Sequence, residues 1–307
     1  MKRATVLAPR SFYVYTSHLK SNISAKVASR EEYILSMLTE VRLPEWLDNY
    51  IYCELGAKYC RSNSDMTVID WDKSDILNYL GTYFPRSYAE AYCIFSHYFT
   101  VHPDAFSGRD TLSVFDFGCG TGGEIIGLLT AVKKCFHNIK HIEVSGLDGN
   151  HHALRLLENI VERYSRTEGV DVRIKVMPAY IADFYDLSCV DDVLKESRFD
   201  IVMSFKAVCE FVTKERFEQN NAYAHLSRFL TYKLTAGGIM LLCDVTTYSN
   251  TAQEWLPMMM DKGLAEAGCR VSLRNDSFNQ TFTVCHSRHS CDKSKVAWRL
   301  IKNEIKP

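Results

Sequence analysis

Residues 114–123 read VFDFGCGTGG and combine an apolar run, a carboxylate and four glycines. Asp116 stands two residues before Gly118, and Gly120 follows one residue later. Glycine adopts backbone angles that other residues avoid and lets a ligand approach the main chain closely. A second acid, Asp148, ends the next short apolar run, and Gly149 follows it. These residue types and spacings predict a ligand site built from a bare loop and two carboxylates.

Two ligand classes suit this loop. Gly118, Gly120 and Gly123 satisfy the G-x-G-x-x-G pattern of dinucleotide-binding proteins. Asp116, however, would repel a pyrophosphate and attract a ligand that carries an ammonium and a sulfonium. Asp148 is placed to accept both hydroxyls of a ribose. The chain has no Tyr-x-x-x-Lys run of the kind that nicotinamide oxidoreductases use, so the pattern favours the cationic ligand.

The elements that would position this loop alternate between strands and helices. Apolar runs predict strands over 112–118, 143–148, 172–180, 199–205, 238–245, 269–274 and 281–287, and amphipathic stretches predict helices over 122–135, 150–165, 189–197, 214–234 and 251–267. This alternation is typical of a doubly wound, mostly parallel α/β sheet of seven strands. The short gap before residue 281 predicts that the last two strands form an antiparallel hairpin, which gives the sheet one reversed strand.

The first third of the chain has a different pattern. Residues 30–107 have helical spacing, with Ser29 as a cap, Pro44 as a break and a hinge at Gly81 and Pro85. We therefore expect an N-terminal arm and helical cap over 1–107 and a Rossmann-like domain over 108–307. The cap is expected to lie over the ligand site as a lid.

The composition of the chain limits the classes of function that it can have. The chain has 307 residues, a formal net charge of −1, and 11 cysteines with no CxxC pair. This usage predicts a reducing, cytoplasmic setting, and no apolar run is long enough for a membrane span. Residues 1–30 contain basic side chains and no acid. Such a segment suits a solvated arm, an organelle transit peptide or an arm that contacts nucleic-acid phosphates.

Four motifs in order resemble those of the class I S-adenosylmethionine-dependent methyltransferases. They are VFDFGCGTGG, SGLDGN, AYIADFYD and FDIVMSFKAVCEF, and the resemblance covers roughly residues 112–290. It implies S-adenosylmethionine as the cofactor, with Asp116, Gly118 and Gly120 holding its methionine part and Asp148 and Gly149 its ribose. It further implies that Asp183 and Phe184 address the adenine and that Ser204 and Phe205 line the floor below the sulfonium.

A second likeness points to the methyltransferase-like family that assembles the small ribosomal subunit. In that family an Arg-x-x-Tyr stretch precedes the glycine motif and a Ser…Glu stretch follows the fourth strand. Here Arg86 and Tyr88, and Ser204 and Glu210, stand in similar places. Arg86 would bind the carboxylate of the cofactor bidentately. The family's cysteine cluster has no counterpart, because CHSRHSC (285–291) matches no zinc or iron–sulfur spacing, and we expect no metal.

The acceptor of the methyl group is not specified by these motifs. Glu210, Tyr248 and His286 are candidate bases or positioning residues for a neutral amine or hydroxyl. The function predicted is methyl transfer to a small molecule or an RNA. The alternative is a non-catalytic protein that binds S-adenosylmethionine and docks on RNA during ribosome assembly. The oligomeric state is left open.

Overall fold

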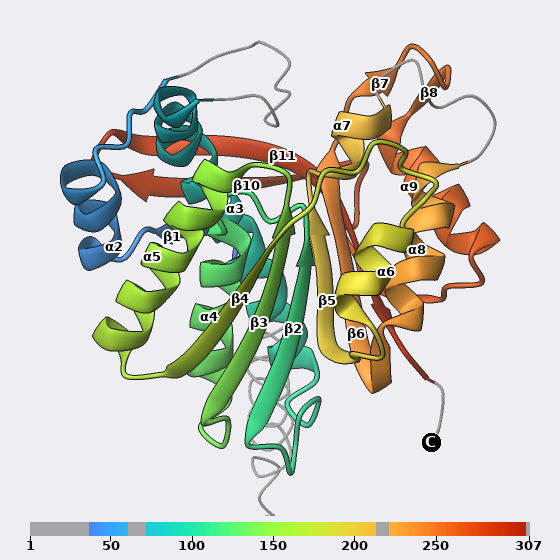
Figure 1. Cartoon of the computed structure of the whole chain (residues 1–307), viewed down its shortest axis with the longest axis horizontal. Helices are drawn as coiled ribbons and strands as arrows, with labels where there is room; N and C mark the ends of the chain where they lie inside the picture. Colours follow the sequence, from blue (N-terminus) through green and yellow to red (C-terminus); the bar gives the residue numbers. More distant parts are fainter. Residues whose placement is uncertain (1–36, 61–71, 213–220, 305–307) are drawn as a thin grey trace, which may run out of the picture. The chain divides into compact units, whose positions relative to one another are not determined.

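The computed structural model describes residues 37–60, 72–212 and 221–304, and residues 38–307 belong to one compact unit. Nine strands of these residues form one sheet with the order β1-β10-β11-β6-β5-β2-β3-β4, and β9 also pairs with β11 (Figure 1). The strands are β1 (Glu40–Arg42), β2 (Thr111–Phe117), β3 (His141–Asp148), β4 (Asp171–Pro178), β5 (Phe199–Phe205), β6 (Leu234–Val245), β9 (Val271–Arg274), β10 (Gln280–His286) and β11 (His289–Lys302). The predicted α/β class and mostly parallel sheet are confirmed, with two strands more than the seven predicted.

Only β11 runs against the others in this sheet. It pairs antiparallel with β6, β9 and β10, whereas β2 pairs in parallel with β3 and β5, β3 with β4, and β5 with β6. One reversed strand was predicted, but its identity was wrong. Residues 271–274 and 280–286 do not pair with each other as a hairpin, because both lie along the same side of the long strand β11.

Helices cover both faces of the sheet. Figure 1 shows α4 and α5 on one side of the strands and α6 and α8 on the other. The helices are α2 (Glu45–Asn49), the π-helix η1 (Tyr50–Glu54), α3 (Lys73–Val101), α4 (Gly123–Cys135), α5 (His151–Glu168), α6 (Ser188–Leu194), α7 (Val208–Val212), α8 (Ala222–Tyr232) and α9 (Leu256–Glu266). The short strands β7 (Tyr248–Ser249) and β8 (Glu254–Trp255) form a separate pair.

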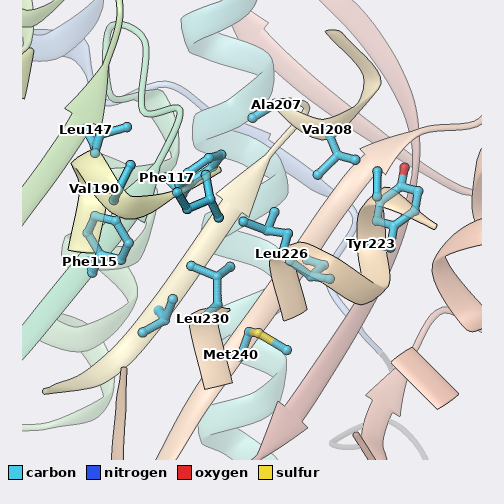
Figure 2. Close-up of a cluster of buried hydrophobic side chains, with 14 of the residues drawn as sticks. Phe115, Phe117, Leu147, Val190, Ala207, Val208, Tyr223, Leu226, Leu230 and Met240 are labelled. Atoms are coloured by element: carbon cyan, nitrogen blue, oxygen red, sulfur yellow. The ribbon is translucent and has the colours of Figure 1, made fainter. Parts of the chain in front are cut away.

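One buried cluster fills the space between the sheet and helices α6, α8 and α9. Figure 2 shows Phe115 and Phe117 of β2 facing Val190 of α6 and Leu226 of α8. Since side chains alternate along a strand, Asp116 between the two phenylalanines must point to the opposite face, where α4 lies.

Helix α3 packs closely along α4 through two glycines. A Cβ on Gly123 would lie 2.4 Å from the carbonyl oxygen of Phe84, and one on Gly127 would lie 2.4 Å from that of Tyr88. Only glycine permits this backbone approach. The segment upstream of the glycine loop is therefore fixed against the helix that follows the loop.

The hinge predicted at Gly81 and Pro85 is not present, because α3 continues through both residues. Proline lacks the N–H that would bond the carbonyl of residue 81. That carbonyl instead accepts a 2.6 Å hydrogen bond from the hydroxyl of Tyr52. A donor from another segment thus replaces the missing helical bond, and the helix stays continuous.

The predicted helix upstream of Pro44 also differs from the structure. Residues 40–42, which include Val41, form strand β1 and pair in parallel with residues 283–285. The arm 1–30, which includes the predicted cap Ser29, and the first part of the predicted helix 214–234 lie outside the described residues. Among the described residues, no helix has both the length and the apolar character needed to span a membrane.

Candidate functional site

The glycine loop lies where the order of the strands reverses. From β2 the chain proceeds to β3 and β4 on one side and to β5 and β6 on the other. Ligands of doubly wound sheets bind outside the carboxyl ends of the strands at this switch point. Asp116 is level with Gly146 of β3 and Met203 of β5, so it stands beside the switch point itself.

The N–H groups of the loop are already used within the chain. Those of Gly118 and Cys119 donate to the carbonyl of Leu147, at 2.8 and 2.9 Å, and that of Gly120 donates to Asp148 Oδ2 at 2.8 Å. The other Asp148 oxygen accepts from the N–H of Asn150. The N–H groups of Gly118, Cys119 and Gly120 are therefore already bonded within the chain.

The backbone of the loop requires glycine. Gly118, Gly120 and Gly122 have φ values of 77°, 47° and 79°, in the left-handed region. A Cβ on Gly118 would also lie 2.5 Å from the Cβ of Ala207, the residue that begins the turn after β5. The loop is thus held between the ends of β3 and β5.

Asp116 is fully buried, and neither of its oxygens accepts a hydrogen bond from a donor among the described residues. Its carboxyl lies within hydrogen-bonding reach of the carboxyl of Glu124, in the first turn of α4. Burial and the neighbouring Glu124 raise the pKa of Asp116 well above its usual value. Burial raises the pKa of Glu124 to about 7, although its own backbone N–H and Lys206 oppose the shift. Two carboxyls this close hold a proton between them.

A third acid reaches this region from α3. Glu90 is fully buried, and its Oε2 lies 2.7 Å from the ammonium of Lys206, which follows β5. Its second oxygen, Oε1, has no hydrogen-bond partner among the described residues. Both Glu90 and Lys206 act electrostatically on Glu124. Glu124 and Glu90 therefore share one nearby lysine.

Tyr79 of α3 lies directly over the loop. A Cβ on Gly120 would be 3.1 Å from the Tyr79 hydroxyl, and the Tyr79 ring stacks on Tyr83. The negative charges of Glu124, Asp148 and Glu210 add to burial in raising the Tyr79 pKa. Tyr79, Glu90 and Glu124 were not named as site residues from the sequence alone. The early part of α3 thus reaches the carboxyl ends of the strands.

The residues predicted to contact the adenine, and those predicted to line the floor below the sulfonium, lie on both faces of the sheet. Asp183 is exposed, and its carboxylate accepts from the N–H of Tyr185. Phe184 is buried and packs edge-on against Phe117. The Ser204 side chain is buried on the α8 side, level with Leu242 of β6, and its hydroxyl has no partner among the described residues.

Phe205 is buried and, by alternation along β5, points to the face of α3 and α4. Tyr88 is also buried and stacks on Tyr92, with its backbone against Gly127 of α4. The structure therefore brings Phe205 to the same face as Asp116, and places Tyr88 within the α3–α4 packing.

Arg86 and His286 meet at Asp292 of β11. The Arg86 guanidinium donates two hydrogen bonds to the Asp292 carboxylate, at 2.8 and 2.9 Å. The His286 ring lies 3.7 Å from the same carboxylate, and its Nδ1 lies 3.0 Å from the Tyr52 hydroxyl. Although burial opposes it, the two hydrogen bonds from Arg86 and the nearby His286 ring hold the pKa of Asp292 at about 2. This network contains no residue of the glycine loop.

The other two predicted catalytic residues follow β5 and β6. Glu210 is in the first turn of α7, half-buried, and its charge acts on Tyr79 and Tyr83. Tyr248 is 41% exposed and packs edge-on against Trp255, which in turn packs against Phe278. Glu210 is therefore the candidate that the structure brings toward the loop, through Tyr79.

Buried groups near α7 explain why Cys209 is a poor nucleophile. Burial and the negative charge of Asp244 raise the pKa of the Cys209 thiol well above its usual value. Asp244 in turn accepts from the Cys209 N–H and the Tyr223 hydroxyl. Within the described parts of the chain, no group of three or more His, Cys, Asp or Glu side chains is arranged to hold a metal ion.

No model of a known protein family matches the sequence, and no curated protein matches it. Similar solved structures include a protein from Listeria monocytogenes described as a class I S-adenosylmethionine-dependent methyltransferase, at 11% identity and a TM-score of 0.43 over 79% of this chain and 65% of that one. The rRNA methyltransferase aviRa from Streptomyces viridochromogenes has 15% identity and a TM-score of 0.40, over 69% and 85% of the two chains. Loganic acid methyltransferase has 10% identity and a TM-score of 0.47, over 79% and 99%.

These likenesses are ones of fold. This chain spans less than two thirds of the length of the Listeria protein. What the glycine loop binds must therefore be argued from its own residues.

Proposed function

We propose that the chain binds S-adenosylmethionine at the glycine loop and transfers its methyl group to an acceptor. One observation carries the proposal: beside the glycine loop lies a buried acid, Asp116, that has no hydrogen-bond donor among the described residues. The N–H groups of Gly118 and Gly120 donate to acceptors within the chain, and Asp116 lies buried beside them. A cationic ligand satisfies such a site.

The same geometry argues against a dinucleotide. A pyrophosphate needs free N–H donors at the loop and at the N-terminus of the following helix. Here the loop donors are bonded to Leu147 and Asp148, and the first turn of α4 carries the Glu124 carboxylate, which bonds its own backbone N–H. A phosphate at this place would therefore lie beside the negative charge of the Glu124 carboxylate, where it needs a positive charge.

The two predicted acids beside the loop then have defined tasks. Asp116 and the loop carbonyls bind the ammonium end of the ligand, and Asp148, held in place by the N–H groups of Gly120 and Asn150, accepts the ribose hydroxyls. S-adenosylmethionine supplies a methyl group that is already activated. The chain's work is therefore to align donor and acceptor and to exclude water.

Glu210 is the best-placed group to receive a proton from a neutral acceptor. It lies after β5, at the carboxyl edge of the sheet, and interacts with Tyr79 over the loop. Two classes of methyl acceptor are proposed, a small molecule and an RNA. A non-catalytic protein that binds the cofactor is the alternative outcome of the test.

Calorimetry with S-adenosylmethionine and S-adenosylhomocysteine tests the binding step. We expect binding by the wild type, a loss of at least tenfold in Asp116→Asn, and no change in the surface control Glu158→Gln. Absence of binding by the wild type, or equal affinity in Asp116→Asn, would overturn the proposal.

Tritiated S-adenosylmethionine with cell lysate, with and without nuclease, tests the transfer step. Label in a large nuclease-sensitive species identifies an RNA acceptor, and label in a low-mass fraction identifies a small molecule. Tight binding with no label in any fraction would replace methyl transfer by the non-catalytic alternative.

A further inference from the structure

The carboxyl groups of Asp116 and Glu124 form a buried pair that the proposed ligand must reorganise. They come from different elements, β2 and α4, and are 0% and 5% exposed. They lie within hydrogen-bonding reach of each other, and neither oxygen of Asp116 has another donor among the described residues. Such a contact between two carboxyls exists only with a proton between them.

The charged groups that act on the pair favour its protonated form or oppose that form only weakly. Asp148 of β3 and Glu90 of α3 are negative and oppose ionisation of the pair. Lys206, after β5, is the nearby cation, but Glu90 holds its ammonium at 2.7 Å. The polar groups Tyr79 of α3 and Cys119 of the loop are neutral, since burial raises the pKa of both. The region lacks one positive charge.

We infer that Glu124 is a second ammonium-binding residue, and that a ligand with an α-ammonium group replaces the proton shared by Asp116 and Glu124. The inference rests on the proposed function and extends it to a residue that the motif resemblance does not include. Before binding, the two carboxyls carry one proton and one negative charge. On binding, the ammonium keeps its three protons and donates to both carboxylates, and the shared proton passes to the solvent.

Proton release is measured by calorimetry in two buffers of different ionisation enthalpy, phosphate and Tris, at pH 7. We expect S-adenosylhomocysteine to release about one proton per site, the number that the shared pair holds. The probe 5′-methylthioadenosine keeps the adenosine and the sulfur but lacks the amino acid part. It is expected to bind more weakly and to release no proton.

The variant Glu124→Gln separates the pair from the rest of the site. It removes one of the two carboxylates that would bind the ammonium, so the affinity for S-adenosylhomocysteine should fall about tenfold. The affinity for 5′-methylthioadenosine should be unchanged, which also reports that the variant is folded. Glu158→Gln, on the exposed face of α5, is the matched control and should behave as the wild type.

The outcomes distinguish the two claims. If no adenosine ligand binds the wild type, the proposed function fails. If S-adenosylhomocysteine binds without proton release, if 5′-methylthioadenosine releases the same proton, or if Glu124→Gln binds S-adenosylhomocysteine as tightly as the wild type, the ammonium role of Glu124 is wrong while the proposed function stands.

Discussion

The ammonium of Lys206 lies 2.7 Å from a carboxylate oxygen of Glu90, and the Glu90 side chain is fully buried. This ion pair joins α3 to the turn that follows β5, so the segment upstream of the glycine loop is tied to the end of the central sheet. Lys206 adopts a left-handed backbone conformation, with φ of 56°. A non-glycine residue in this region is strained, and the ion pair is one of the interactions that hold it there.

Loss of Lys206 alone should be severe. Lys206→Met leaves the Glu90 carboxylate buried without its cation, and breaking a buried pair in this way costs about 3–5 kcal/mol. Urea unfolding of Lys206→Met, Glu90→Gln and the double variant measures the interaction. We expect the double variant to be more stable than the sum of the single losses, and additive losses would contradict the ion pair.

The acidic pair makes stability depend on pH. The Glu124 pKa rises from 4.5 in the unfolded chain to about 7 in the native one, so between these values the native state holds more protons. The free energy of unfolding therefore falls as the pH rises from about 4.5 to about 7. Glu124→Gln should flatten this fall by roughly 1–3 kcal/mol, since one pKa unit corresponds to about 1.4 kcal/mol. Denaturant unfolding at pH 5 and pH 8 gives the comparison.

Asp116 and Asp244 contribute falls of the same sign, because burial raises the pKa of both carboxyls, that of Asp244 from 3.8 to about 6. The Glu124→Gln profile should thus keep a residual slope. A profile parallel to that of the wild type would show that Glu124 ionises normally in the native state.

Tyr52 and Pro85 should be energetically coupled. Tyr52→Phe removes the hydroxyl that satisfies the Gly81 carbonyl, and a buried unsatisfied carbonyl costs about 1–3 kcal/mol. In a Pro85→Ala background the N–H of residue 85 is restored and bonds the same carbonyl, so Tyr52→Phe should cost less there. A double-mutant cycle from denaturant unfolding measures the difference, and equal costs in both backgrounds would contradict the coupling.

Arg86 is expected to act on stability through Asp292. The two side chains are 16% and 4% exposed, so Arg86→Met leaves a buried carboxylate and should cost about 3–5 kcal/mol at pH 7. The cost should shrink as the pH falls from about 4 toward 2, where Asp292 becomes protonated in both states. Calorimetry on the same variant tests the predicted binding of the cofactor carboxylate, since that role requires a loss of affinity as well.

The parts of the fold that depend on local pattern were predictable from the sequence. Apolar runs gave the five parallel strands around the glycine loop within a few residues, and β5 matches its predicted range. Strand β11 was missed because its first half, HSCDKSK, is polar and resembles a solvated tail. It becomes a strand because β6 on one side and β10 on the other bond its backbone, which no local pattern reveals.

The site was predictable in its glycines and two acids but not in the residues around them. Glu124 follows GTGG and resembles an ordinary first-turn acid that complements a helix dipole, while Glu90 resembles an exposed residue of a long helix. Their burial depends on the close packing of α3 and α4 at Gly123 and Gly127. Arg86 pairs with Asp292 instead of standing free for a cofactor. Asp292 is 206 positions away in the sequence and becomes a neighbour of Arg86 only in the folded chain.

The pairing of β1 with β10 has a consequence for the order in which the chain folds. Residues 40–42 pair with residues 283–285, Tyr52 contacts His286 at a separation of 234 positions, and Arg86 contacts Asp292 at 206. Loops of this length close slowly, and nothing offsets their entropy until the distant partner exists. The parallel strands β2 to β6 use much shorter connections. The segment that carries Tyr52 should therefore dock in a late kinetic step, after the central strands have formed.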